Sequence, residues 1–319
     1  MSVTEHDALD REPVERPSVS AIVATRDRVE LLRRAVRSIL RQRYDGPIQV
    51  VVVFDRSDPV ELGIEPPPDR SIRVLRNDRT PGLAGARNTG IAAAAGDFVG
   101  FCDDDDEWLP DKLEEQVRSL ERARDASLSA TGIEIVGDAS ATPIARVAAE
   151  PVIRFDQLLR SRLQELHPSS FLMRRTTLVD RIGLVDEQIP GSYGEDYEFL
   201  LRAAKMGPIV NVGRPLVRVH WHRSSFFQER WDVIVRAIRY LLERYPEFRR
   251  SPRGLARLRA RVAFAYAAMG ERASARRWAR SSLAASPLER RAYLALLVST
   301  RLVPAAVLVR LANRAGRGI

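Results

Sequence analysis

Short apolar runs alternate with helical patterns through the first hundred residues, and this alternation limits the folds open to the chain. Runs rich in Val, Ile and Phe are typical of buried strands, and they occur at residues 18–24, 48–54, 72–75 and 97–102. Amphipathic or small-residue patterns typical of helices lie between them, at residues 29–42 and 82–95. This order predicts an α/β fold in which parallel strands are joined by right-handed crossovers.

The middle of the chain predicts a mixture of short elements. Helices are expected at residues 113–123, 155–163 and 196–206, the last one stopped by a Gly-Pro pair. Strands are expected at residues 127–136, 169–173 and 210–212, with a turn at 137–142.

From residue 226 the pattern changes to Arg-rich amphipathic helices, expected at residues 233–245, 255–269, 273–285 and 289–298. Residues 256–287 weakly resemble one tetratricopeptide repeat, because Tyr266, Gly270, Ala275 and Pro287 lie at repeat-like offsets. The polar residues 1–16 lack the pattern of a signal peptide and are expected to be a disordered leader. We therefore predict an α/β domain at 17–225 and a helical region at 226–319.

The net charge of +9 is unevenly distributed. Residues 214–319 contain 23 Arg, no Lys and 6 acidic residues, whereas the rest of the chain has 28 basic and 36 acidic residues. Such a basic half suggests nucleic acid or an anionic membrane as a partner. The aromatic residues of this half lie at helical spacing, which favours a core role over base stacking, so nucleic acid is not the expected partner.

The apolar stretch 293–311 is interrupted by Arg301 and Pro304 and falls short of a membrane span. An interfacial or packed amphipathic helix fits it better. We expect a cytoplasmic protein that makes peripheral contact with the inner face of the membrane. The single cysteine, Cys102, excludes an intramolecular disulfide.

Four consecutive aspartates, Asp103 to Asp106, follow the predicted strand 97–102. Their carboxylates repel one another, so the run is costly unless a positive charge lies among them. Oxygen ligands suit Mg²⁺ and Mn²⁺, and open α/β sheets bind ligands at the carboxyl ends of their strands. Taken alone, however, such a run is more often a solvated loop or a helix N-terminus, and Pro110 does open the next helix.

Five ordered segments carry the chemistry: VATRDR at 23–28, FDRS at 54–57, GLAGARNTG at 82–90, AGDFVGFCDDDDEWLP at 95–110 and GEDYEFLLR at 194–202. In this order they closely resemble a family 2 glycosyltransferase over residues 17–225. The resemblance implies the GT-A fold, a Rossmann-like mixed sheet flanked by helices, with the all-α extension outside it. It also implies a metal-dependent transfer of a sugar from a nucleotide-sugar donor to an acceptor hydroxyl, with inversion.

The resemblance assigns the donor contacts. Thr25 and Asp55 fall in its nucleotide pocket, Arg87 lies near the diphosphate, and Asp104 is placed at the ribose. Arginine suits a phosphate because its fork donates two parallel hydrogen bonds. The family usually shows two acidic residues where this chain has Phe54 and Asp55, so the nucleotide base stays open. A turn-capping aspartate and a surface arginine are the structural alternatives for Asp55 and Arg87.

The resemblance also assigns the metal site. Asp105 is the expected direct ligand of Mn²⁺ or Mg²⁺, and Asp103 is its partner through ribose or water. A histidine near His220-Trp221-His222 would complete the shell, and we assign His222. His167 lies in a segment that is near the acceptor or the donor sugar in related enzymes.

Asp196 is the expected general base, because the second acid of Glu195-Asp196 has that role in the family. An ordinary acidic pair at a helix N-terminus is the alternative explanation. Glycan, polysaccharide, lipid-linked and small-molecule acceptors all remain open. Two other functions are alternatives. A nucleotidyltransferase with a similar fold is disfavoured because no Gly-rich loop follows the first strand, and a protein-binding scaffold is compatible with catalysis.

Overall fold

The computed structural model describes residues 16–137, 142–221 and 230–314. Its first half is a parallel sheet in the order β3-β2-β1-β4. The strands are β1 (Val19–Thr25), β2 (Ile48–Phe54), β3 (Arg70–Arg76) and β4 (Phe98–Asp103). Two helices separate them in sequence, α1 (Val29–Leu40) and α2 (Leu83–Ala93). The predicted parallel arrangement of the first hundred residues is confirmed.

The sheet continues as a mixed one in the full order β3-β2-β1-β4-β9-β6-β10-β5. The added strands are β5 (Glu107–Trp108), β6 (Leu128–Gly137), β9 (Leu172–Arg174) and β10 (Ile209–Trp221), with β7 (Ile144–Arg146) on β6 and β8 (Val152–Ile153) on β10. Strand β9 is antiparallel to both β4 and β6, whereas β10 runs parallel to β6.

Two predicted strands differ from the observed ones. Strand β10 continues for thirteen residues where only 210–212 were expected, because register shifts around Pro215 absorb the Gly-Arg-Pro interruption. The expected strand 169–173 instead begins with the turn η1 (Pro168–Ser170), in which Ser170 Oγ donates to the carbonyl of His167. Pairing with β4 starts only at Leu172.

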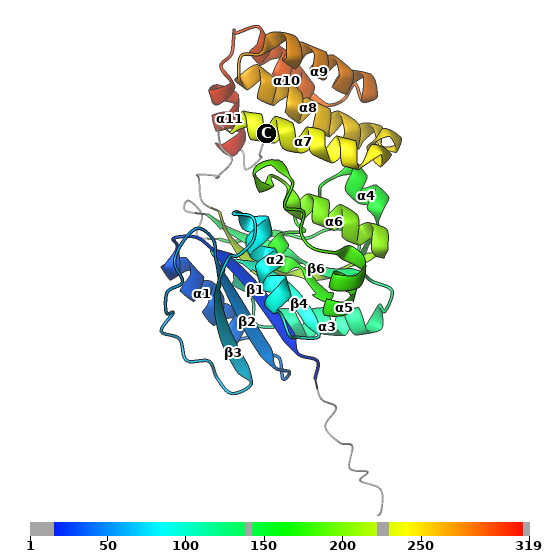
Figure 1. The fold of residues 1–319 in the computed structure, drawn as a ribbon. Helices are drawn as coiled ribbons and strands as arrows, with labels where there is room; N and C mark the ends of the chain where they lie inside the picture. The colour runs from blue at the N-terminus through cyan, green and yellow to red at the C-terminus, as the bar shows by residue number, and fades with distance from the viewer. Residues whose placement is uncertain (1–15, 138–141, 222–229, 315–319) are drawn as a thin grey trace, which may run out of the picture.

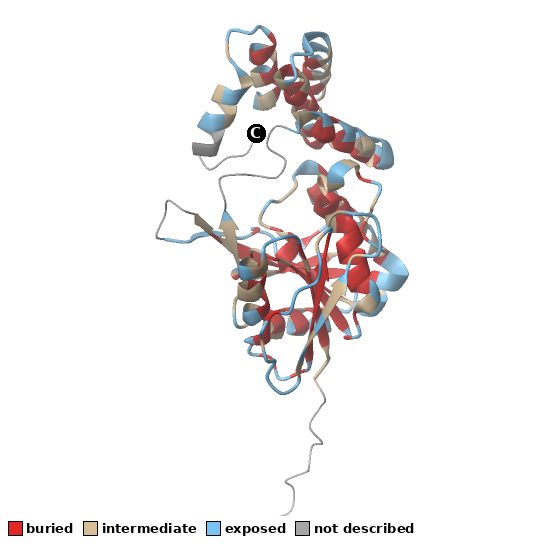
Figure 2. Ribbon diagram, turned by 60° about the vertical axis from the view of Figure 1, so that its left-hand side comes forward, coloured by how far each residue is buried: buried red, intermediate tan, exposed pale blue. Residues whose placement is uncertain are grey.

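Helices cover both faces of the sheet (Figure 1). On one face, α1 and α3 (Lys112–Arg122) bury residues such as Val36 and Val117 against Val50. On the other, α2 and α6 (Glu195–Met206) bury residues such as Phe199 against Val51. The buried residues are concentrated in central strands such as β1, β2 and β4, whereas every residue of the edge strand β3 is intermediate or exposed (Figure 2).

Helix α2 lies unusually close to the sheet. A Cβ on Gly90 would collide with the side chain of Ile22 on β1. The small residues of this helix thus let it approach β1, and they carry Arg87 to the strand ends.

The described part of the C-terminal region contains the α-helices α7 (Trp231–Arg244), α8 (Pro252–Ala268), α9 (Arg272–Ala285), α10 (Arg290–Ser299) and α11 (Ala305–Arg314). The four predicted helices are confirmed to within a few residues. The tetratricopeptide resemblance stays a prediction. Alanines such as Ala260, Ala279 and Ala292 form a small core between α8, α9 and α10.

Helices α7 and α8 also belong to the core of the α/β part. Ile238 and Leu258 share a buried cluster with Leu158 of α4 (Phe155–Arg160) and Leu200 of α6. Figure 1 shows α7 and α8 lying over α4 and α6. The domain limits at 17 and 225 stay predictions. The expected leader falls almost wholly outside the described residues.

Short turns complete the chain: α5 (Arg175–Thr177), η2 (Leu178–Ile182), η3 (Pro190–Ser192) and η4 (Pro246–Arg250). Within the described residues, we find no helix with the length and apolar character that crossing a bilayer requires. The apolar stretch 293–311 is divided at Pro304 between α10 and α11.

Candidate active site

The residues predicted to bind the nucleotide-sugar lie together at one edge of the sheet. Thr25 ends β1, Asp55 follows β2 and Asp103 ends β4, and register pairing places these ends side by side. In a parallel sheet the carboxyl ends of neighbouring strands share one edge, where α/β proteins bind ligands.

Asp55 is buried and holds the loop that leads into α2. Its Oδ1 accepts hydrogen bonds from Asn77 Nδ2 at 2.8 Å and from the backbone N–H of Gly82 at 3.0 Å. This is the turn-capping behaviour expected of an aspartate after a strand. Phe54, in the position of the missing acid, is buried in the core. A nucleotide contact by Asp55 stays a prediction.

Asp104 is held by two partners from the first strand and the loop after it. Its Oδ2 accepts from Thr25 Oγ1 at 2.7 Å and from Arg28 Nε at 3.2 Å. Burial raises the pKa of Asp104 to about 6, although Arg28 and Thr25 act in the opposite direction. Arg28 also donates to Asp105 Oδ2 at 2.7 Å. Sequence reasoning missed this arginine, although it lies in the quoted segment VATRDR.

Arg87 joins three elements at the centre of the site. The guanidinium is buried and donates to Asp103 Oδ1 and to Glu195 Oε1, both at 2.7 Å. Burial raises the pKa of Asp103, but Arg87, His167 and Arg28 together act in the opposite direction, and the net pKa is lowered. Burial raises the pKa of Glu195 to about 7, with Asp196 adding to the effect. Arg87 is therefore not a surface arginine.

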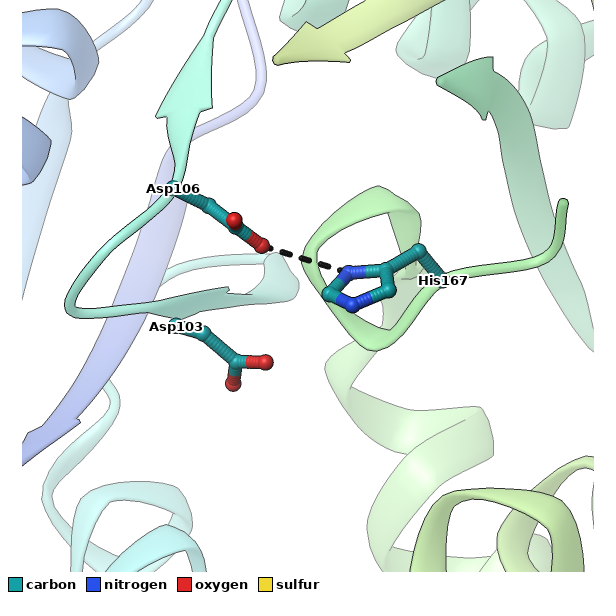
Figure 3. A group of neighbouring side chains, drawn as sticks. All are labelled: Asp103, Asp106 and His167. Atoms are coloured by element: carbon teal, nitrogen blue, oxygen red, sulfur yellow. Dashed lines mark ion pairs between the residues drawn. The ribbon is translucent and has the colours of Figure 1, made fainter. Parts of the chain in front are cut away.

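Asp103 also belongs to a group of side chains that could bind a metal ion. Figure 3 shows Asp103, Asp106 and His167, each offering a ligand atom within 4.8 Å of the others. His167 Nδ1 lies 3.2 Å from Asp106 Oδ2, which also accepts from Ser169 Oγ at 2.6 Å. Burial raises the pKa of Asp106 well above its usual value and lowers the pKa of His167.

These three side chains have the ligand chemistry of a divalent metal site. Two carboxylates and an imidazole can bind a divalent cation, and the cation would offset the repulsion between the two acids. Sequence reasoning did not place Asp106 in such a group. The predicted ligand Asp105 is not in it either, because its carboxylate faces Arg28. The predicted ligand His222 lies outside the described residues, and His220 Nε2 lies 2.7 Å from Glu107 Oε1.

Asp196 lies in the first turn of α6, next to Glu195. Its Oδ1 accepts from the backbone N–H of Tyr197 at 2.8 Å, and its Oδ2 accepts from Arg162. Arg162 follows α4, and Asp196 raises its pKa. No motif pointed to Arg162. The structure thus joins Asp103, Arg87, Glu195 and Asp196 in one charged network.

Comparisons with known proteins show the family of the chain. Residues 20–180, about half of the chain, match the family described as Glycosyl transferase family 2. The UDP-Glc:alpha-D-GlcNAc-diphosphoundecaprenol beta-1,3-glucosyltransferase WfgD of Escherichia coli is 28% identical over 225 residues, covering 68% of this chain and 85% of that protein. The succinoglycan biosynthesis protein ExoO of Rhizobium meliloti is 37% identical over 123 residues, covering 38% of this chain and 33% of that protein.

A solved structure resembles the whole fold. The crystal structure of S. aureus TarS 1-349 in complex with UDP-GlcNAc has a TM-score of 0.59 and 17% identity, covering 94% of this chain and 92% of that one. At this identity the likeness concerns the fold. It confirms the predicted GT-A arrangement of a mixed sheet with flanking helices and a C-terminal helical part.

Proposed function

The chain belongs to glycosyl transferase family 2 and is a glycosyltransferase, and we propose that it moves a sugar from a nucleotide-sugar donor to an acceptor hydroxyl with inversion. One observation carries this proposal. Arg87 donates hydrogen bonds to Asp103, at the carboxyl end of β4 where we expect the sugar donor, and to Glu195, the neighbour of the proposed base. With the donor diphosphate bound near Asp103 and the attacking oxygen near Asp196, Arg87 would lie between the two reacting groups.

The donor would lie along the strand ends. Thr25 and Asp55 would contact the nucleoside, Asp104 the ribose, and Arg87 the diphosphate. The burial of Arg87 and its ion pairs with two carboxylates support this role. A fixed guanidinium is favoured at a leaving group whose negative charge grows in the transition state.

We propose that Asp103 and Asp105 hold a divalent metal, Mn²⁺ or Mg²⁺, with His222 as a further ligand. The ion pair of Asp105 with the half-exposed Arg28 is of the weak, solvated kind, so Asp105 can leave it at little cost. Asp103, Asp106 and His167, whose ligand atoms lie within 4.8 Å of one another, form the alternative ligand set. The metal would neutralise charge on the departing nucleoside diphosphate.

Asp196 would act as the general base. Its carboxylate accepts the proton of the acceptor hydroxyl as that oxygen forms a bond to the anomeric carbon and the bond to the nucleoside diphosphate breaks. A single in-line displacement inverts the anomeric centre. Arg162 would orient Asp196 until the acceptor arrives, since it donates to Oδ2.

The acceptor belongs to glycan, polysaccharide or glycolipid biosynthesis in this proposal. The names of the relatives support it, because they specify a diphosphoundecaprenol acceptor and succinoglycan. We also propose a cytoplasmic location with peripheral contact at the inner face of a membrane, and the 23 arginines of residues 214–319 support the contact with anionic lipids. The family match disfavours the nucleotidyltransferase and nucleic-acid alternatives.

Replacement of the base tests the proposal. A thermal-shift panel of nucleotide-sugars with and without Mn²⁺ first identifies the donor. Asp196→Asn should then lower the transfer rate by about 10²–10⁴-fold while the donor affinity stays within about twofold. Asp232→Asn, at an exposed acid of α7, is the matched control. Full activity of Asp196→Asn would remove Asp196 as the base, and no response to any nucleotide-sugar would contradict the proposed function.

A further inference from the structure

The proposed base lies in a segment that contacts several other elements. We call residues 185–198 the base segment: it contains η3 and the first turn of α6, and it carries Asp196. Near its start, Asp186 contacts α7, whereas the next residue, Glu187, contacts the loop between β3 and α2. These two side chains therefore join the base segment to two different parts of the chain.

The donor side of the site holds the base segment through α2 and the loop before it, residues 77–82. Asn88 of α2 exchanges two hydrogen bonds of 2.8 Å with the backbone of Val185, and it donates to Glu187 Oε1 at 2.7 Å. The backbone N–H of Thr80 donates to Glu187 Oε2 at 3.3 Å. Asp55 holds the same loop at both of its ends. The loop beside the expected nucleotide pocket is thus bonded to the base segment.

Helix α7 holds the same segment by hydrogen bonds at its two ends. Tyr240 Oη donates to Asp186 Oδ2 at 2.7 Å. Tyr245, the residue after the helix, donates from its Oη to Glu198 Oε1, also at 2.7 Å. Glu198 is fully buried, so this second bond lies in the protein interior. Asp186 and Glu198 lie on either side of Asp196 in the sequence, and α7 therefore supports the segment before and after the proposed base.

The backbone of the base segment also packs directly on α7. Gly191 of η3 has a φ of +62°, a conformation that favours glycine. A Cβ at this position would lie 2.6 Å from Cγ1 of Val233, a buried residue in the first turn of α7. The helix thus contacts the segment five residues before Asp196 as well as at its ends.

The bond between Tyr240 and Asp186 persists at neutral pH, because the phenol keeps its proton. Burial and the hydrogen bond to Asp186 raise the pKa of Tyr240 to about 12. Arg244 Nε lies 3.7 Å from Asp186 Oδ2 and 3.4 Å from Glu198 Oε1, so a cation of α7 stands near both acids.

We propose that Tyr240 and Glu187 are positioning residues for the general base, and that they fix Asp196 relative to the donor by holding the base segment to α7 and to the loop 77–82. A base must lie within hydrogen-bond reach of the proton it accepts, and a misplacement of about 1 Å can lower a rate about 10²-fold. This proposal rests on the proposed function, since it needs Asp196 as the base. It gives the helical extension a part in the transfer reaction.

Hydrogen exchange followed by mass spectrometry tests the contacts without turnover. Tyr240→Phe should speed the exchange of amides in the base segment and leave that of α1 as in the wild-type chain. Asp186→Asn keeps a carbonyl acceptor for Tyr240 and should show a smaller change. Tyr266→Phe removes a hydroxyl of α8 that has no hydrogen-bond partner among the described residues, and should leave the exchange unchanged. Thermal denaturation checks that each variant is folded.

Hydrolysis of the nucleotide-sugar selected by the thermal-shift panel measures the effect on the reaction, with water as the acceptor. The water oxygen bonds to the anomeric carbon, Asp196 takes its proton, and the nucleoside diphosphate leaves. Tyr240→Phe should lower kcat about tenfold, with KM for the nucleotide-sugar within about twofold of wild type. Glu187→Ala should lower kcat and also raise KM, because Glu187 holds the loop on the donor side as well.

A background without the base separates positioning from a general structural role. In Asp196→Asn, the change Tyr240→Phe should lower the rate no further, because Tyr240 acts only through Asp196. An equal loss in both backgrounds, or a wild-type kcat in Tyr240→Phe, would overturn the inference for Tyr240. Wild-type kcat and KM in Glu187→Ala would overturn it for Glu187.

The two readouts distinguish this inference from the proposed function. Unchanged exchange of the base segment in Tyr240→Phe, in a chain that binds and hydrolyses a nucleotide-sugar, would refute the positioning role alone. Faster exchange in a chain that binds no nucleotide-sugar would refute the proposed glycosyl transfer and reduce α7 to a structural support.

Discussion

Arg87 and Glu195 lie 108 positions apart in the sequence, yet the guanidinium of one donates to the carboxylate of the other at 2.7 Å within the protein interior. A second 2.7 Å bond from Arg87 reaches Asp103. The arginine is therefore the counter-charge for one acid on β4 and one on α6. Its loss would leave the buried Glu195 and the partly buried Asp103 without this cation.

Arg87→Met should destabilise the protein by about 3–5 kcal/mol, the usual cost of removing one partner from a buried ion pair. Arg87→Lys keeps the charge but not the fork, so its loss of stability should be smaller. Urea denaturation of both variants measures the difference. Arg37→Met, at an exposed position of α1, should change the free energy of unfolding by less than about 0.5 kcal/mol. Equal stability of Arg87→Met and Arg37→Met would contradict this account.

The two candidate metal-ligand sets share Asp103 and differ in Asp105 and Asp106. We expect Asp103→Asn and Asp105→Asn to reduce Mn²⁺-dependent affinity for the nucleoside diphosphate at least about tenfold, a change of about 1.4 kcal/mol. Asp106→Asn should keep the Mn²⁺ response, because its carboxylate already accepts from Ser169. Calorimetric titration with and without Mn²⁺ measures all three. The reverse pattern would assign the metal to the group containing His167.

The sequence alone predicted the site residues that lie at the ends of strands. Thr25 and Asp103 end apolar runs, and a parallel sheet necessarily brings such ends together. Arg162 and His167 lie in the segment between α4 and β9, whose path depends on tertiary packing, so no periodicity could place them. The length of strand β10 was underestimated for a related reason, because its pairing with β6 continues beyond Pro215.

The packing of the C-terminal helices on the α/β part predicts that the two unfold together. Phe248 of η4 is almost fully buried, and its ring centroid lies 6.4 Å from that of Tyr197 on α6. Phe248→Ala should cost about 3–5 kcal/mol. Urea denaturation should show one transition, followed both by Trp fluorescence and by circular dichroism. Leu302→Ala, at an 80% exposed position, is the control; two separate transitions in wild type would contradict shared folding.

Lys112 gives a prediction about pH, because its ammonium is buried at the start of α3. Its Nζ has no hydrogen-bond partner among the described residues and lies 3.7 Å from the ring centroid of Trp108. Burial lowers the pKa of Lys112 to about 7 in the folded protein, whereas the unfolded chain keeps the ordinary value of 10.5. Between these values the unfolded state binds the extra proton, so this group makes stability rise with pH.

Lys112→Met should therefore stabilise the protein by about 1–3 kcal/mol at pH 7, since it removes a buried donor that lacks a partner. The advantage should shrink as the pH rises from 7 toward 10, because the wild-type lysine is then neutral in the folded state and its burial costs less. Urea denaturation of both proteins at pH 7, 8 and 9 measures this difference directly. Lys205→Met, which removes a lysine from the surface pair with Glu247, should show no such trend. A constant difference between Lys112→Met and wild type across this range would mean that Lys112 does not titrate there.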